Sequence, residues 1–359
     1  MEVSSIFKKL RIVDLSTVLA GPSVGSFFAE LGAEVLKVEP PQKPDVTRSW
    51  KLPEEDKESA VSAYFSSVNY KKNYTELNLK DEAQRIALLR QVRNADLVLM
   101  NFKKGDQEKL KITDGVLRKD NPGLIIGKIN GFGADSNRVA YDLILQAETG
   151  FMAMNGTPES GPVKMPLALI DVLAAHHLKE GLLIELLARN SVEAYKGKSV
   201  CVSLYDAAVS SLVNQASNYL MNGHIPERIG SLHPNIAPYG ELFKTSDHKT
   251  ITFAIGNNLH FKKLCLFLGV SELLEDHKFS TVQKRVAHRT ELYEQLKPLV
   301  QKHKAVEVLS YMRKESVPCG EIKDLSAVFS NEKAKALIRE ENIAGIETKR
   351  ITGIAFKRK

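Results

Sequence analysis

The sequence predicts an α/β protein with a doubly wound parallel sheet, joined to a second, smaller α+β domain. Strand-like and helix-like segments alternate from the N-terminal region onward, which is typical of a parallel sheet with helices on both faces. A polar, turn-rich stretch, "HIPERIGSLHPNIAPYG", follows, and the pattern changes after it. The length of 359 residues also favours two hydrophobic cores over one.

The first predicted unit lies in residues 10–39 and consists of a strand, a helix and a second strand. An apolar run is followed by a helical pattern and then by "EVLKVE", which alternates with a period of two. Pro22 suits the first turn of the helix and Gly32 its end. The alternation continues with a helix over about 81–94, a strand in "DLVLMNF", a helix over about 107–119 and a strand in "LIIGKI".

The smaller domain is predicted to span residues 225–320. Within it, "ELFKT" and "TITFAIG" are expected to pair as antiparallel strands, followed by amphipathic helices over about 257–269 and 284–315. We therefore assign residues 1–200 to the large domain and residues 201–224 to a linker helix.

Composition and charge argue against several classes of protein. The 50 Lys and Arg residues exceed the 43 Asp and Glu residues by 7, which suits an anionic ligand, but they are scattered beside acids, so nucleic-acid binding is not expected. No long uncharged apolar run is present, so we predict no membrane span, no secretion signal and a cytoplasmic location. Cys201, Cys265 and Cys319 form no CxxC pair, which predicts reduced cysteines and no metal site.

Common nucleotide-binding and catalytic motifs are incomplete. The turn "AGPSVG" is not a G-x-G-x-x-G, which argues against a dinucleotide site even though Glu39 stands where a ribose-binding acid is expected. "YKGKSV" contains Gly-Lys-Ser, but Val192 occupies the first glycine position of a P-loop. His176 and His177 belong to no HExxH motif, and no G-x-S-x-G is present.

Asp171 has two interpretations from the residues alone. It lies between "PLALI", a predicted strand, and a long helical pattern, so it suits the N-cap position. A carboxylate at that junction also lies where open parallel sheets bind ligands, and the helical neighbours Ala174 and Ala175 offer no base to pair with it. In the second interpretation Asp171 is a nucleophile that the positive end of the helix keeps ionised.

A series of segments, in order along the chain, resembles one known family. The segments are "DLSTVLAGPSVGSFFAELGAEVLKVEPP", "DVTR", "VNYKKN", "ADLVLMNF", "INGFG", "AYDLILQAETGFMAMNG", "ALIDVLAAHH", "VSLYDAA", "APYG" and "VPCG". Each is short, but together they resemble the class III CoA-transferases of the CaiB/BaiF type.

This resemblance implies transfer of CoA from an acyl-CoA donor to a small carboxylic acid, through covalent anhydride and thioester intermediates on Asp171. CoA would enter as the acyl-CoA substrate, so no tightly bound cofactor and no metal is expected. The positions at which the family binds CoA correspond here to Leu19, Ala20, Lys72, Asn101, Phe102 and Lys109.

The resemblance also implies an architecture. The large domain would be Rossmann-like, residues 321–359 would return to it, and two ring-like chains would form an interlocked homodimer. Departures from the family pattern leave alternatives open. Ala175 replaces a frequent glycine, and the sequence ends at "IAFKRK", before a common histidine-containing tail, so a CoA-binding protein without turnover stays an alternative. An acyl-CoA racemase of the same superfamily is another, but Tyr141 stands where its acid-base histidine is expected.

Overall fold

The computed structural model describes residues 7–356, and within them the chain forms two compact units. The first unit contains the chain up to Met152, Lys164–Pro226 and the chain from Ala336 onward, and the second contains Ala153–Val163 and Glu227–Lys335. The division differs from the sequence-based assignment at residues 153–163, 201–226 and 321–335, and residues 201–226, which were assigned to a linker helix and the start of the small domain, belong to the first unit. Residues 153–163 belong to the second unit because their backbone binds it: Gly230 N donates to Gly156 O at 2.7 Å.

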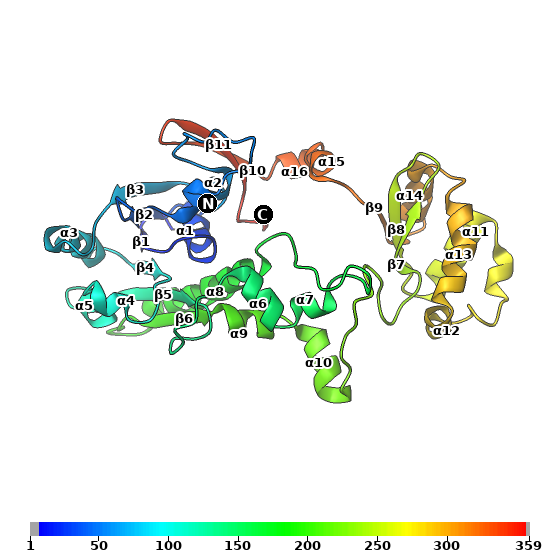
Figure 1. Ribbon diagram of the computed structural model, residues 1–359, viewed down its shortest axis with the longest axis horizontal. Coiled ribbons are helices and arrows are strands. Elements are labelled where there is room, and N and C mark those ends of the chain that lie inside the picture. Colours follow the sequence, from blue (N-terminus) through cyan, green and yellow to red (C-terminus); the bar gives the residue numbers. More distant parts are fainter. Residues whose placement is uncertain (1–6, 357–359) are drawn as a thin grey trace. The chain divides into compact units, whose positions relative to one another are not determined.

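A six-stranded parallel sheet forms the centre of the first unit, in the order β3-β2-β1-β4-β5-β6 (Figure 1). Its strands are β1 (Arg11–Asp14), β2 (Glu34–Glu39), β3 (Lys72–Glu76), β4 (Leu97–Met100), β5 (Ile125–Asn130) and β6 (Ser199–Ser203). Strands β2 and β3 lie on one side of β1, and β4, β5 and β6, which come later in the chain, lie on its other side. The loops after β1 and β4 therefore diverge and leave a crevice at the carboxyl edge of the sheet. The predicted doubly wound sheet is confirmed.

Helices cover both faces of this sheet. On one face, α1 (Ala20–Glu30), α8 (Leu169–Ser191) and α9 (Leu204–Ser210) share a buried apolar core with Ile12 of β1. On the other, α3 (Glu82–Arg93) and α5 (Asp114–Arg118) share a core with Val13. Neighbouring strand residues thus enter opposite cores, which explains why the strands are apolar throughout. The unit also contains α2 (Ala63–Ser67), α4 (Asp106–Lys109), α6 (Asp142–Glu148), α10 (Val213–Asn222) and a 3-10 helix, Val46–Ser49, while α7 (Phe151–Met154) lies at the boundary between the units.

The single helix predicted over residues 107–119 is wrong, because two short helices, α4 and α5, occupy this stretch. Lys111 adopts a φ of 56° between them. This left-handed conformation cannot continue an α-helix, so the chain turns there. The helix predicted over 81–94 is confirmed as α3, and the side chain of Asp81 caps it.

The C-terminal hairpin and the residues directly after it are bound to α1. The antiparallel hairpin of β10 (Ile338–Ile343) and β11 (Ile346–Ile351) belongs to the first unit. The buried carboxylate of Glu30 on α1 accepts hydrogen bonds from Arg350, from the hydroxyl of Thr352 and from Gly353 N. One acid therefore ties the C-terminal hairpin to the first helix of the sheet.

The second unit has its own sheet and core. Strands β7 (Tyr239–Lys244), β8 (Thr250–Ala254) and β9 (Cys319–Glu321) are antiparallel, in that order, and the predicted pair is confirmed as β7 and β8. Around them lie α11 (Asn258–Leu268), a 3-10 helix (Ser271–Leu274), α12 (Val282–Ala287), α13 (Arg289–Val300), α14 (Ala305–Lys314), α15 (Leu325–Phe329) and α16 (Glu332–Lys335). No helix within residues 7–356 combines the length and apolarity needed to cross a membrane.

Candidate active site

A cavity of about 400 Å³ opens at the crevice of the six-stranded sheet. It is lined by the loops that follow β1, β4 and β5 and by the first turn of α8. These loops meet where the strand order reverses, which is the usual ligand position in an open parallel sheet. Of the residues predicted from sequence to form a site, the structure brings these to the cavity wall: Leu19, Ala20, Asn101, Phe102 and Asp171.

The loop after β1 has an unusual backbone that polar side chains hold in place. Val18 has a φ of 72°, which is rare for a β-branched residue. The side chain of Asn101 both accepts from Thr17 N at 3.0 Å and donates to Thr17 O at 2.9 Å. Val18 N donates to the carboxylate of Asp45 at 3.1 Å. Asn101 therefore shapes the cavity wall through its amide group.

Lys72, the first residue of β3, is buried against Asp14 and does not line the cavity. Its ammonium group donates to Asp14 Oδ2 at 2.8 Å, to Pro22 O at 2.8 Å and to Asn69 Oδ1 at 2.9 Å. An ammonium has three N–H donors, so all of them have protein partners. This leaves none for a phosphate of CoA, against the prediction that Lys72 binds the ligand directly.

Asp14 belongs to the same buried group of charges. Burial by itself would raise the pKa of Asp14, but the ammonium groups of Lys72 and Lys37 outweigh burial and lower it. Its other oxygen accepts from Ser16 N at 3.0 Å. The carboxylate thus connects the buried lysines to the start of the loop that lines the cavity.

Leu19 and Ala20 stand at the N-terminal end of α1. Leu19 is the N-cap, and no side chain of residues 7–356 caps this end of the helix. The first backbone N–H groups of a helix have no partner within the helix, so amide donors and the positive end of the helix dipole lie at the cavity wall. The backbone is also tight here, because a Cβ on Gly21 would lie 2.4 Å from the side chain of Ser16.

Asp171 is inside α8 and is not its N-cap. The helix begins at Leu169 with Ala168 as N-cap, and the segment before it is not a strand, so both predictions are wrong. An acid from elsewhere binds the free amides: Asp142 Oδ1 of α6 accepts from Ile170 N at 2.6 Å and, more weakly, from Asp171 N at 3.4 Å. The side chain of Asp171 is therefore not used as a cap and can face the cavity.

The surroundings of Asp171 oppose its ionisation. Asp171 is 9% exposed. Burial, assisted by the nearby charge of Asp142, raises the pKa of its carboxyl group to about 7. The expectation that the helix N-terminus keeps this acid ionised is therefore wrong, because loss of hydration and a like charge outweigh the dipole. Tyr64 of α2 faces the same acids: burial, followed by the charges of Asp171 and Asp142, raises the pKa of its phenol to about 12.

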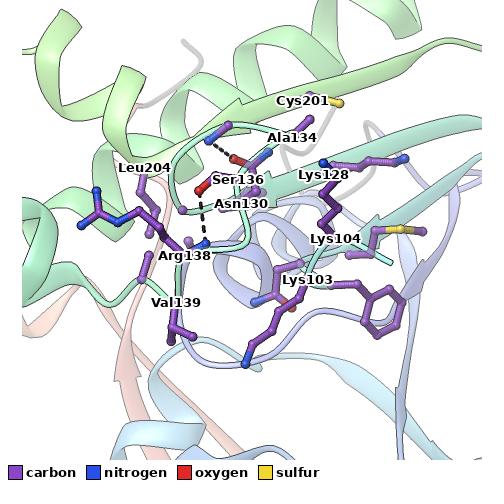
Figure 2. A pocket seen from close by; sticks show the side chains of 18 of the residues that line it. Lys103, Lys104, Lys128, Asn130, Ala134, Ser136, Arg138, Val139, Cys201 and Leu204 are labelled. Carbon is purple, nitrogen blue, oxygen red and sulfur yellow. Dashed lines mark hydrogen bonds between the residues drawn. The ribbon is translucent and has the colours of Figure 1, made fainter. Parts of the chain in front are cut away.

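Basic side chains line another part of the cavity. Figure 2 shows Lys103, Lys104, Lys128 and Arg138 around it. Lys128 pairs with Asp114 at 2.6 Å and Arg138 with Glu148 at 2.6 Å. Lys104 donates to Asp135 O at 3.1 Å and lies 3.9 Å from its carboxylate, and both Lys103 and Lys104 are exposed. These four residues were not predicted from the sequence to form part of a site. The signal was present in "NFKKG", where two lysines directly follow the predicted Asn101 and Phe102.

Lys109 and Tyr141, which the family resemblance also singled out, lie differently: Lys109 is outside the cavity wall and Tyr141 is part of it. Lys109 is not among the residues that line the cavity; its side chain is exposed and its ammonium lies 3.3 Å from Asp106. Tyr141 does line the cavity and is the N-cap residue of α6. A phenol thus occupies the position at which the racemase alternative requires an acid-base histidine.

Comparison with known proteins identifies the family of this chain. The model of CoA-transferase family III matches residues 7–354, and the chain belongs to this family. It is 33% identical to succinate–glutarate CoA-transferase of Agrobacterium fabrum over 333 residues, which cover 91% of this chain and 82% of that protein. It is 34% identical to acetyl-CoA:oxalate CoA-transferase of Acetobacter aceti over 324 residues, which cover 89% and 81%.

A solved structure agrees with the sequence comparisons. The crystal structure of a CAIB/BAIF family protein from Brucella suis superimposes with a TM-score of 0.85 at 34% identity, covering 98% of this chain and 93% of that one. The predicted family, the α/β fold class and the prediction of a CoA-transferase enzyme are confirmed.

Proposed function

We propose that this enzyme moves CoA from an acyl-CoA to a small carboxylic acid through covalent intermediates on Asp171. One observation carries the proposal. Asp171 is a buried carboxyl group that lines the cavity, and among residues 7–356 no side chain or amide donates a hydrogen bond to its carboxyl oxygens. Buried acids are normally paired, and an unpaired one in a ligand cavity is a candidate for chemistry.

The first half of the reaction loads CoA onto the enzyme. A carboxylate oxygen of Asp171 attacks the thioester carbonyl of the donor, which forms a mixed anhydride and releases CoA as a thiolate. The thiolate then attacks the carbonyl carbon of Asp171. The anhydride breaks, the donor acid leaves as a carboxylate, and CoA stays bound as an aspartyl thioester.

The second half transfers CoA to the acceptor. The acceptor carboxylate attacks the aspartyl thioester, which expels the CoA thiolate and forms a second anhydride. The thiolate attacks the acceptor carbonyl, which gives the new acyl-CoA and regenerates the carboxylate of Asp171. Thioester energy is conserved through both halves, so the cycle consumes no other reagent.

The cavity supplies stabilisation where charge develops in these steps. Each attack creates an oxyanion beside Asp171, and the uncapped end of α1 at Leu19 and Ala20 provides backbone N–H groups at the same cavity. Fixed donors of this kind need no rearrangement during the reaction. The hydrogen bonds from Asn101 and to Asp45 keep the preceding loop, including Val18, in the conformation that presents this helix end.

We assign the phosphate groups of CoA to the basic part of the cavity. Lys103 and Lys104 are exposed there, and a phosphate is the anion that lysine commonly binds as a point charge. The acids exchanged are proposed to be small dicarboxylic acids, because the two relatives above are named for succinate, glutarate and oxalate.

Chemical trapping tests the role of Asp171. The enzyme is incubated with succinyl-CoA and then with hydroxylamine, which converts an aspartyl thioester or anhydride to a hydroxamate. Peptide mass mapping is expected to find the hydroxamate at Asp171 and at no other acid. The control is the same treatment with free CoA and succinate, which gives no hydroxamate. An enzyme that exchanges CoA at full rate without any modification of Asp171 contradicts the proposal.

We also propose that the chain works as a homodimer. Large apolar side chains of the first unit are exposed on α8 and α10, a pattern that marks protein interfaces. They are Ile184, Leu187, Val213, Leu220 and Met221. A second copy of the chain is the partner that the family resemblance implies. Sedimentation equilibrium is expected to give twice the mass of one chain, and a monomer that keeps full activity contradicts the proposal.

A cytoplasmic location is part of the same proposal. Cys201, Cys265 and Cys319 are all unpaired, which is the usual state of cysteines in a reducing compartment. Fractionation of the source cells with an antibody to the chain is expected to place it in the cytosolic fraction.

A further inference from the structure

We propose that Asp142 is a positioning residue for Asp171, which from α6 fixes the first turn of α8 and by its negative charge moves the pH range in which the nucleophile is active to higher pH. The inference rests on the proposed nucleophilic role of Asp171. It assigns a task to an acid that the reaction cycle itself does not use.

The first turn of α8 depends on α6 for its capping. Ala168 at the N-cap has no side-chain oxygen, and no residue next to it in sequence caps the helix. Asp142 Oδ1 instead accepts from Ile170 N at 2.6 Å, across 28 residues of sequence. A carboxylate at a helix N-terminus stabilises the free amides and the helix dipole. The backbone that carries Asp171 is therefore fixed by a residue of another helix.

Asp142 is itself held by a neighbour on α6. Its second oxygen, Oδ2, accepts from Gln146 Nε2 at 2.5 Å. Gln146 is 1% exposed, and its Oε1 accepts from Met165 N at 2.7 Å. Gln146 thus connects Asp142 to the segment that leads into α8. Both oxygens of Asp142 have partners, so its carboxylate has little freedom to move away from Asp171.

The same contact brings two negative charges together. Burial and then the charge of Asp142 raise the pKa of Asp171 to about 7. Among residues 7–356, the phenol of Tyr64 on α2 also faces Asp171 and is neutral in this range, and Asp45 faces the same phenol. The titratable side chains of Lys103, Lys104, Lys128, Arg138 and Tyr141 line the same cavity, but burial and Asp142 are the causes of the raised pKa of Asp171. The start of α1 and the loop after β4 contribute uncharged groups to the same cavity: the backbone of Leu19 and Ala20 and the amide side chain of Asn101. Asp142 is therefore the charge that most directly opposes ionisation of the nucleophile.

The two effects of Asp142 act in opposite directions on the reaction. Its hydrogen bonds hold Asp171 for attack and accelerate the reaction at every pH. Its charge keeps part of the Asp171 population protonated below neutral pH, and a protonated carboxyl group cannot attack the thioester. A substitution that keeps the hydrogen bonds but moves the charge away separates the two effects.

The double variant D142N/Q146E separates the effect of the hydrogen bonds of Asp142 from the effect of its charge. The amide introduced at position 142 can accept from Ile170 N and donate to the carboxylate introduced at position 146. That carboxylate can still accept from Met165 N, so the principal hydrogen bonds are kept while the charge moves one helical turn from Asp171. The measurement is the pH dependence of CoA thiol release in a single turnover with succinyl-CoA. We expect the acidic limb of this profile to shift to lower pH by about one unit relative to the native enzyme.

Two single variants complete the experiment. D142A removes both the cap and the charge, so the rate at the plateau of the profile is expected to fall by about tenfold or more. E180Q removes an exposed charge from α8 itself and is the matched control, whose profile is expected to coincide with that of the native enzyme. Thermal melting by circular dichroism establishes that each variant is folded.

The outcomes separate this inference from the proposed function. An unshifted acidic limb in folded D142N/Q146E overturns the role of the charge, and a native plateau rate in folded D142A overturns the role of the cap. If D142A does not fold, the double variant decides alone, with an unshifted limb overturning the proposal. A native enzyme that releases CoA thiol without an adduct on Asp171 contradicts the proposed function instead.

Discussion

Two buried carboxyl groups near the carboxyl edge of the same sheet have opposite surroundings. Asp14, at the end of β1, is fully buried, and Lys72 and Lys37 lower its pKa although burial opposes them. Asp171, in the first turn of α8, is almost as buried but forms no ion pair with any residue in 7–356, and burial together with Asp142 raises its pKa to about 7. Within the part of the chain that the structure describes, Asp14 is paired with cations and Asp171 has no hydrogen-bond donor or cation as partner.

This difference in surroundings distinguishes Asp14, whose role is structural, from Asp171, whose proposed role is chemical. A buried carboxylate with a matched ammonium fixes the loop that lines the cavity, and removing either partner would leave an unpaired charge in the interior. A buried carboxyl group without a partner lowers the stability of the folded state, and proteins retain such groups where they are used in chemistry. The comparison therefore predicts that substitutions at Asp171 affect activity, whereas those in the Asp14–Lys72 pair affect stability.

The largest expected effect is the loss of catalysis in D171A. Without the nucleophile no aspartyl intermediate forms, so exchange of a labelled acid into acyl-CoA should fall by about four orders of magnitude or more. D171E tests geometry, since it keeps the carboxylate but moves it by one methylene, and should retain a small fraction of the rate. Measurement of kcat for CoA exchange checks both variants. A near-native kcat in D171A would contradict the chemical role that the comparison with Asp14 gives to Asp171.

K72M is expected to act on stability first. It leaves the carboxylate of Asp14 buried without its ammonium partner, so the free energy of unfolding should fall by about 3–5 kcal/mol. Urea denaturation followed by circular dichroism measures the change. The double variant D14N/K72M removes both charges and should recover much of the lost stability. If K72M alone were as stable as the native protein, the pair would have no structural role.

In contrast to K72M, which should lose stability, D171N should gain stability at alkaline pH. The pKa of Asp171 is raised from an unfolded value near 3.8 to about 7, so the folded state binds the proton more tightly. The stability that this proton contributes is fully present below about pH 4 and is lost as the pH rises through about 7. D171N has no such proton and should become more stable than the native protein by about 2–4 kcal/mol at pH 8. Urea titrations at pH 4 and pH 8 test this, and an equal difference at both values contradicts it.

Sequence reasoning reached the fold and most of the cavity wall, because both depend on local patterns. Strand and helix alternation predicted the parallel sheet, and Leu19, Asn101 and Asp171 meet at its switch point. What could not be predicted depends on contacts between distant residues. The cap of α8 comes from Asp142, 28 residues earlier, so the local pattern favoured Asp171 as the cap.

The roles of the basic residues also depend on contacts between distant residues and could not be predicted from local sequence. Lys72 was predicted to bind the ligand because of its charge and family position, but its environment consists of Asp14 and two other acceptors brought together by the fold. Lys103 and Lys104 were not selected because lysines beside a glycine are ordinary surface residues in sequence. Only the cavity distinguishes them.

A smaller effect is expected from the exposed lysines. K104A removes a cation at the cavity and should raise the KM for acyl-CoA by about threefold to tenfold with little change in kcat. K109A is the matched control, since its ammonium pairs with Asp106 outside the cavity, and its KM should stay within about twofold of the native value. The opposite order of effects would place the phosphates of CoA at Lys109.

The central claim is tested most directly by following oxygen atoms. Each cycle in the proposed reaction gives one oxygen of Asp171 to the departing donor acid and takes one from the acceptor. The tryptic peptide of residues 165–179 contains Asp171 as its one acidic side chain, so its mass reports this exchange. With succinyl-CoA and an acceptor acid whose carboxylates carry 18O, the peptide should gain one heavy oxygen in a single turnover and a second in later turnovers. A peptide that stays unlabelled while labelled acceptor becomes acyl-CoA would contradict the account.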